Sequence, residues 1–262
     1  ANITNVFTQV SVNAIIAVGM TFVILTGGID LSVGSTLAIS GALSASIVKS
    51  TGSITLAILG AAVCGIIIGF INGILIAKGK LQAFIATLAT MTIFRGVTLV
   101  YTDGTPISKL SESFAKIGNA KIGFIPVPVI ITIIIAIIAI FILSQTKFGR
   151  YLYALGGNEE SAKLSGINTD RIKMMTYVVS GFVSAIAGVI ITSRIGSASP
   201  NAGTGFELDA IAAVVIGGTS LAGGEGKISG TIIGALIIGV LNNGLNLMNV
   251  SPFYQSIVKG LV

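Results

Sequence analysis

Apolar runs of nearly membrane-spanning length recur along the whole chain, and this pattern constrains the fold more than any other feature. Short polar stretches separate the runs, which cover about residues 5–26, 33–49, 54–77, 82–101, 125–143, 172–194, 208–222, 228–248 and 253 onward. A helix needs roughly 20 residues to cross the hydrocarbon core of a bilayer. Because lipid offers the backbone no hydrogen-bond partners, an apolar run that spans it folds as a helix. The pattern therefore predicts an all-α integral membrane protein, a polytopic bundle of transmembrane helices.

The composition supports this class and excludes several others. Hydrophobic residues make up 53% of the 262 residues and charged residues only 9%, whereas an ordinary soluble domain carries about 25% charged residues. Histidine is absent and Cys64 is the single cysteine, so neither a disulfide scaffold nor a Cys/His metal site is indicated. The net charge of +6 comes from scattered basic residues, which is not the pattern of a nucleic-acid-binding protein. We expect no catalytic site, no metal and no cofactor in this chain.

The domain organisation is simple. No Ser- or Pro-rich linker divides the sequence, so residues 1–262 are predicted to form a single transmembrane domain. Eight runs count as complete spans, and the run from about 253 to 262 covers only ten residues. Since a span needs roughly 20 residues, we expect the rest of that helix, and one N-terminal helix, to lie beyond the ends of this sequence.

Basic residues are concentrated in two loops. The stretch 144–173 carries five of them, and the turn 77–81 carries Lys78 and Lys80. Because cytoplasmic loops are enriched in Lys and Arg, both loops are predicted to lie on the cytoplasmic side. The stretch 102–124 then lies outside, although it also holds three lysines.

Small residues recur at every fourth position in two of the runs. They are Ala61, Gly65, Gly69 and Gly73 in one, and Gly226, Gly230 and Gly234 in the other. This spacing places small residues along one helical face, where two helix backbones can approach closely. Close packing within one subunit is the simpler interpretation, and contact between two subunits is the alternative.

Asp30 and Arg95 are charged residues that interrupt the apolar pattern. Such residues usually face the interior of a bundle, because exposing them to lipid is costly. Asp30 lies in a glycine-rich break and is predicted to cap the helix that begins near Ser32; a place on a translocation pathway is the alternative. Arg95 is assigned a structural role, by snorkelling to the interface or by pairing with Asp103.

Amides also interrupt the apolar faces, at Asn72, Asn242 and Asn246 among others. Because Asn242 and Asn246 are four residues apart, they lie on one side of a helix. Hydrogen bonds between helices would explain these side chains. A polar passage for a solute such as a sugar would explain them equally well, so both interpretations stay open.

The loop 144–173 contains a helix with clear end signals. Asn158 is a good N-cap, Glu159 and Glu160 occupy the first turn, Lys163 lies in the last turn, and Gly166 can end the helix in the left-handed conformation. The segment therefore predicts a short, free-standing helix of about seven residues in the cytoplasm. Isolated helices of this length are marginal, so a partner is expected to dock against it.

This segment, GRYLYALGGNEESAKLSGIN (149–168), resembles the coupling loop of the permease subunits of ribose-type ABC importers, a variant of the EAA motif. The resemblance continues in order through ILTGGIDLSVGS (24–35), AKGKLQAFIATLATM (77–91), RGVTLVYTDGTPI (95–107), GTGFELDAIAAVVIGGTSLAGGEGKISGT (203–231) and NNGLNLMNVSPFYQ (242–255). It implies that the loop 144–173 engages an ATPase through the residues Gly157, Asn158, Glu159, Glu160, Ala162 and Gly166.

The resemblance further implies about ten spanning helices and a location in the bacterial inner membrane. It implies three protein partners: a second copy of this chain, an ATPase with two nucleotide-binding cassettes, and an extracytoplasmic sugar-binding protein. The imported solute would be a monosaccharide, with D-ribose as the first expectation. The chain lacks a GxxxxGK[ST] phosphate-binding loop, so the partner would hydrolyse the ATP and this chain is not an enzyme.

Two other classes compete with this interpretation. A secondary carrier or channel for a small polar solute would explain the helices, but such carriers usually place several ionisable groups at membrane depth. Here there is little beyond Asp30 and Arg95. An intramembrane enzyme is the other class, and no Ser/His, Asp/Asp or His-metal constellation supports it.

Overall fold

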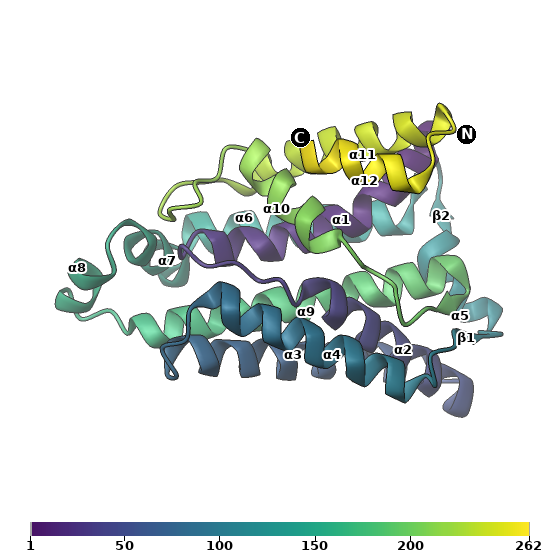
Figure 1. Cartoon of the computed structure of the whole chain (residues 1–262), viewed down its shortest axis with the longest axis horizontal. Coiled ribbons are helices and arrows are strands. Elements are labelled where there is room, and N and C mark those ends of the chain that lie inside the picture. The colour runs from purple at the N-terminus through teal and green to yellow at the C-terminus, as the bar shows by residue number, and fades with distance from the viewer. Residues whose placement is uncertain (1, 262) are drawn as a thin grey trace.

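The computed structural model describes residues 2–261 as one bundle of helices that run side by side (Figure 1). The first half contains α1 (Asn2–Ile24), α2 (Val33–Thr51), α3 (Ile54–Ala77), α4 (Ala83–Tyr101), α5 (Glu112–Asn119) and α6 (Val127–Gln145). The second half contains α7 (Lys147–Gly157), α8 (Glu159–Leu164), α9 (Thr169–Ile195), α10 (Phe206–Ile216), α11 (Ile228–Leu247) and α12 (Pro252–Leu261). The predicted fold class, an all-α membrane bundle, is confirmed.

Two small sheets close the loops at one end. Strand β1 (Ile107–Ser108) pairs antiparallel with β4 (Ser197–Ala198), and β2 (Lys121–Ile122) pairs antiparallel with β3 (Ile125–Pro126). Each strand has only two residues, so the sheets connect loops and do not form a layer of the core.

Six of the described helices, α1, α3, α4, α6, α9 and α11, are long and apolar enough to cross a membrane. The prediction of eight complete spans is therefore not met. The clearest correction concerns 208–222, where α10 has 11 residues and ends at Ile216. At 1.5 Å per residue it extends about 16 Å, roughly half the hydrocarbon core. It ends there because Gly217 and Gly218 follow, and Gly218 adopts a positive φ of 87° that other residues rarely adopt.

Helix α9 packs closely against α3 in the middle of the bundle. A Cβ atom at Gly69 would overlap the carbonyl oxygen of Tyr177, and one at Gly65 would overlap that of Gly181. Gly234 lies equally close to the carbonyl oxygen of Ala213, where α11 packs against α10. The fourfold spacing of small residues thus serves packing within one subunit, as the simpler interpretation predicted. Such contacts let dispersion stabilise the bundle where lipid supplies no hydrophobic driving force.

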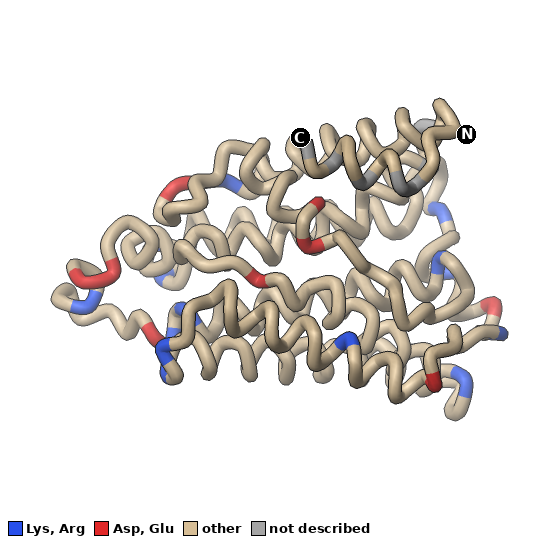
Figure 2. The backbone as a smooth tube through the Cα atoms, viewed as in Figure 1, with Lys and Arg blue, Asp and Glu red and all other residues tan. Residues whose placement is uncertain are grey.

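The two basic loops lie at the same end of the bundle. The Nζ of Lys80, in the turn after α3, is 2.7 Å from Oδ1 of Asp170, in the first turn of α9. The segment 102–124, which includes β1 and α5, lies at the opposite end (Figure 1). Figure 2 shows that most charged residues gather toward these two ends. The shared end of the two loops is confirmed, and the assignment of that end to the cytoplasm stays a prediction.

Arg95 is held by backbone groups. Its Nη1 donates hydrogen bonds to the carbonyl oxygens of Pro200 and Ala202, at 2.7 and 2.8 Å. The prediction of a pair with Asp103 is therefore wrong, because the loop between α9 and α10 passes beside α4 and supplies these acceptors.

A search for membrane-length apolar runs also missed α5 and α7, since both helices are short.

Candidate functional site

The capped helix predicted in the loop 144–173 is α8, and it follows α7 with only Asn158 between them. The Oδ1 of Asn158 accepts the backbone N–H of Ser161 at 2.8 Å, so the predicted N-cap is confirmed. Gly166 has a φ of 79°, in the left-handed region, as predicted for the end of this helix. The helix has six residues rather than about seven.

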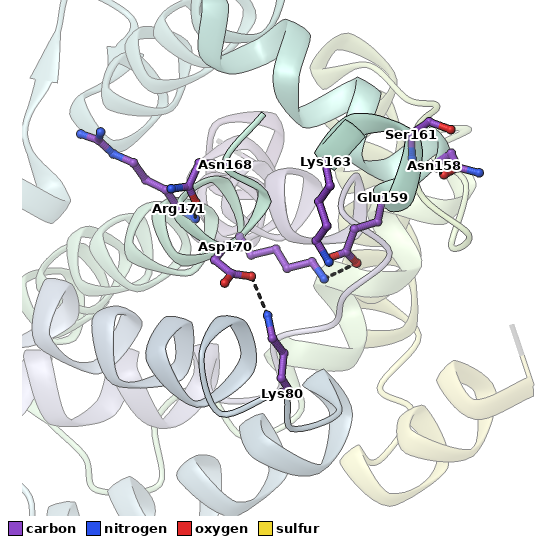
Figure 3. A network of polar contacts seen from close by, with 9 residues as sticks. Lys80, Asn158, Glu159, Ser161, Lys163, Asn168, Asp170 and Arg171 are labelled. Carbon is purple, nitrogen blue, oxygen red and sulfur yellow. Dashed lines mark hydrogen bonds and ion pairs between the residues drawn. The ribbon is translucent and has the colours of Figure 1, made fainter. Parts of the chain in front are cut away.

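The prediction that α8 is free-standing is wrong. Glu159 forms ion pairs with Lys163 at 2.9 Å and with Lys173 of α9 at 2.6 Å (Figure 3). Ala162 is buried, with 4% of its surface exposed. The helix is thus attached to the first turns of α9, because the chain reverses at Gly166 and brings Lys173 back toward Glu159.

The charge of Glu159 is stabilised by these two lysines. Partial burial alone would raise the pKa of its carboxyl, but hydrogen bonds from Lys173 and Lys163 outweigh burial and lower the pKa to about 2. A lowered pKa in the folded state means that the contribution to attachment is complete above the ordinary value of 4.5. It is lost as the pH falls from there toward 2.

We expect Glu159→Gln to loosen α8 at neutral pH. Both ion pairs are partly exposed and weakened by solvent screening, and their joint loss should raise the population of detached α8 several-fold. A spin label at Ser161→Cys, in a Cys64→Ala background, reports this as increased mobility. With Glu159 intact, mobility should stay constant between pH 8 and pH 5. Equal mobility with glutamate and glutamine at pH 7 would contradict the attachment, and Glu112→Gln at the other end is the control.

The end of α7 contacts both glycine-rich breaks of the chain. A Cβ atom at Gly156 would overlap the carbonyl oxygen of Leu25 and the backbone nitrogen of Gly224. That nitrogen donates a hydrogen bond to the same carbonyl oxygen at 3.0 Å. We call these backbone contacts of Leu25, Gly27, Gly156, Gly223 and Gly224 the glycine junction. It joins α7 to the segment before α2 and to the segment between α10 and α11.

A cavity of about 370 Å³ lies between the ion pairs and the glycine junction. Its lining includes Lys80, Glu159, Lys163 and Lys173 together with Gly27 of the glycine junction. The ion pairs that attach α8 and the break at Gly27 thus border the same cavity.

Asp30 and Asn72 belong to one buried network. The Oδ1 of Asp30 accepts the N–H and the hydroxyl of Ser32, at 3.0 and 2.6 Å, and its Oδ2 accepts the hydroxyl of Ser180 at 2.7 Å. Asn72 donates from Nδ2 to the Ser32 hydroxyl at 2.8 Å. Asp30 accepts the backbone N–H of Ser32, which is itself the N-cap of α2. The carboxylate therefore stabilises the turn before α2 and, contrary to the prediction, no described side chain caps the first N–H groups of the helix itself. The network also connects the segment before α2 to Asn72 of α3 and to Ser180 of α9. These connections support a structural role for Asp30 and Asn72.

Asn242 and Asn246 lie elsewhere, beside a second cavity at the opposite end of the bundle. The four residues predicted for a pathway or a helix break are thus separated into two pairs. Two polar residues at the second cavity, Asn13 and Asp209, were not singled out from the sequence. Both are polar residues within largely apolar helical runs, and that was the signal that could have identified them.

The long apolar helices, the half-length α10 and the two glycine-rich breaks are typical of a multi-pass membrane transport protein. The family model described as branched-chain amino acid transport system / permease component matches residues 2–262, and the chain belongs to this family. It is therefore a permease component, and a multi-pass protein of the bacterial inner membrane.

Several curated relatives match the chain from end to end. It is 58% identical to the ribose import permease of Haemophilus influenzae and 57% identical to that of Bacillus subtilis, each over 100% of this chain and 82% of the relative. It is 44% identical to the D-allose transport system permease of Escherichia coli, over 99% of this chain and 80% of the relative. No solved structure matches the chain.

Proposed function

We propose that this chain is the membrane-spanning subunit of an ATP-driven importer that carries a monosaccharide across the bacterial inner membrane. The proposed monosaccharide is D-ribose. The observation that carries the proposal is the identity of 57–58% to two ribose import permeases over the whole chain. Identity to the permeases for D-allose and L-arabinose is lower, at 44% and 42%. We therefore assign this chain a preference for ribose, the sugar in the names of the more similar relatives.

The ATPase, with its two nucleotide-binding cassettes, would bind α8 from outside the membrane. Leu164 at the end of α8 is 90% exposed, so its apolar side chain is available for a partner to cover. Glu160 is also exposed and makes no hydrogen bond or ion pair with any described residue. The attached face of α8 is thus Glu159 and Ala162, and the face available to the ATPase is Glu160 and Leu164.

The remaining partners would use the outer surfaces of the bundle. In α3, α4 and α6, no more than 28% of the most apolar window is buried, which suits contact with lipid and with a second copy of this chain. The extracytoplasmic sugar-binding protein would dock at the end opposite α8, where α5 and the short sheets lie.

The proposed mechanism transmits force through the glycine junction. ATP binding would close the cassettes and move α8 and α7 together, since Asn158 alone separates the two helices. Gly156 would carry this movement to both glycine-rich breaks, and the bundle would open toward the binding protein. Coupling requires that the ATPase bind α8 with different affinity in the two states.

We expect Glu160→Lys to lower sugar uptake about tenfold or more, because a reversed charge at a protein interface costs several kcal/mol. Membrane insertion should be unchanged, since Glu160 lies exposed in the loop 144–173, outside the long apolar helices. The measurement is uptake and co-purification of the ATPase, with Glu112→Lys as the matched control in the first turn of α5. Wild-type uptake and wild-type co-purification would contradict the proposed docking face.

The whole proposal is tested by reconstituting the full-length permease in liposomes with its ATPase and its binding protein. Uptake of labelled ribose should require ATP and both partners, and D-allose should enter more slowly. Uptake by the permease alone without nucleotide would instead favour a secondary carrier or channel.

A further inference from the structure

A polar cavity of about 410 Å³ lies between α1, α9, α10, α11 and α12. It contains Arg194 from the last turn of α9, whereas the first turn of α9 carries Asp170 beside Lys80. Helix α9 runs from the end that carries α8 to the opposite end of the bundle (Figure 1). Because Arg194 lines the cavity, the cavity lies toward that opposite end. Its volume falls within the range of about 300–1,000 Å³ that small-molecule sites occupy.

The polar groups of this cavity surround one carboxylate. Asp209 is 5% exposed, and its Oδ2 accepts hydrogen bonds from Nδ2 of Asn13 at 3.4 Å and from Nδ2 of Asn242 at 3.5 Å. Ordinary N–H···O bonds measure about 2.9–3.0 Å. Both bonds are therefore long, so a hydroxyl that enters the cavity can compete with either amide for this carboxylate.

Asn242 also has an acceptor in need of a donor. The residue is 7% exposed, and its Oδ1 has no hydrogen-bond partner among the residues that the structure describes. A buried polar atom without a partner is costly, because it has given up its hydrogen bonds to water. A ligand that donates a hydrogen bond to this atom recovers that cost, so the cavity is suited to a molecule with several hydroxyl groups.

The geometry points to a monosaccharide-binding site in this cavity, a temporary site on the import route that rests on the proposed function. One sugar hydroxyl donates to Asp209, a second donates to Oδ1 of Asn242, and the Nδ2 groups of Asn13 and Asn242 donate to sugar oxygens. Asn246 lies one turn beyond Asn242 on α11, closer to the outer end. Such a site must bind weakly, because a transported solute has to leave it again.

The first test compares uptake with ATPase activity in the reconstituted transporter. Asn242→Leu, alone and with Asn246→Leu, should lower uptake at limiting sugar about tenfold, the factor expected for one or two lost hydrogen bonds. Stimulation of the ATPase by the loaded binding protein should stay within about twofold, because α8 and the glycine junction are untouched. Asn243→Leu, on the same helix but outside the cavity lining, is the matched control and should transport normally.

The second test measures occupancy without transport. In a Cys64→Ala background, Asn246→Cys should react with a membrane-impermeant maleimide, and ribose on the order of 100 mM should slow the reaction several-fold. Sucrose at equal osmolality should not, because a disaccharide fills the cavity poorly. Absence of protection by ribose would overturn the inference, as would undiminished uptake by the double variant. Failure of the proposed function is a separate result, namely no monosaccharide uptake by the wild-type transporter.

Discussion

Replacement of Gly156 by valine is expected to lower ATP-driven uptake at least about tenfold while the protein still inserts and folds. The added side chain would overlap the carbonyl oxygen of Leu25 and the backbone of Gly224. These are backbone atoms that cannot rotate away, so α7 must withdraw from both glycine-rich breaks. Overpacking of this kind costs about 1–3 kcal/mol, and withdrawal separates the proposed docking helix from the segments that it moves.

The measurement compares uptake with ATP hydrolysis in the reconstituted transporter. For Gly156→Val we expect hydrolysis to continue and uptake to fall, because the ATPase still binds α8. Gly96→Val is the matched control, since a Cβ at Gly96 in α4 meets no atom within 4 Å. If Gly156→Val transports as well as Gly96→Val, the glycine junction does not transmit the movement.

Replacement of Gly69 by alanine is expected to destabilise the bundle by about 2 kcal/mol. Alanine favours a helix over glycine by about 0.8–1.0 kcal/mol, so intrinsic propensity alone predicts the opposite sign. Packing decides, because the new methyl group would overlap the carbonyl oxygen of Tyr177 and lie 2.8 Å from the Cα of Val178. Helices α3 and α9 would then have to separate along their whole contact.

Thermal unfolding in detergent checks this prediction, with an expected decrease of about 4–8 °C in the midpoint. Gly60→Ala is the control in the same helix, since its added Cβ meets only the terminal part of the Ile47 side chain, which can rotate. An unfolding midpoint for Gly69→Ala equal to or above that of Gly60→Ala would contradict the prediction. It would show that α3 and α9 can separate at Gly69 without loss of stability.

The sequence pattern predicted the long helices well, because the length of an apolar run is a direct consequence of bilayer thickness. It did not predict that α10 is only half as long as a span, since the run 208–222 stays apolar through the point where Gly217 ends the helix. Small residues at fourfold spacing predicted close packing correctly. The sequence did not predict which helix packs against these residues. A helical face made of Gly and Ala has no side chain that indicates its partner.

The local structure of α8 was also predictable, since Asn158 and Gly166 act through neighbours within a few residues. Its attachment was not, because the pair Glu159–Lys173 depends on how the chain reverses before α9. The same reason explains why Asn72 and Asn242 were grouped although they lie beside different helices. Polar residues in apolar runs identify interior positions, and only the packing of the helices decides which of them meet.

The central claim is that α8 receives the ATPase, and site-specific photocrosslinking tests it most directly. A photoreactive amino acid at position 160, in the assembled transporter, should form an adduct with the ATPase, while the same group at position 112 should form none. An adduct that appears with the ATPase at 112, or none at 160, would contradict the account.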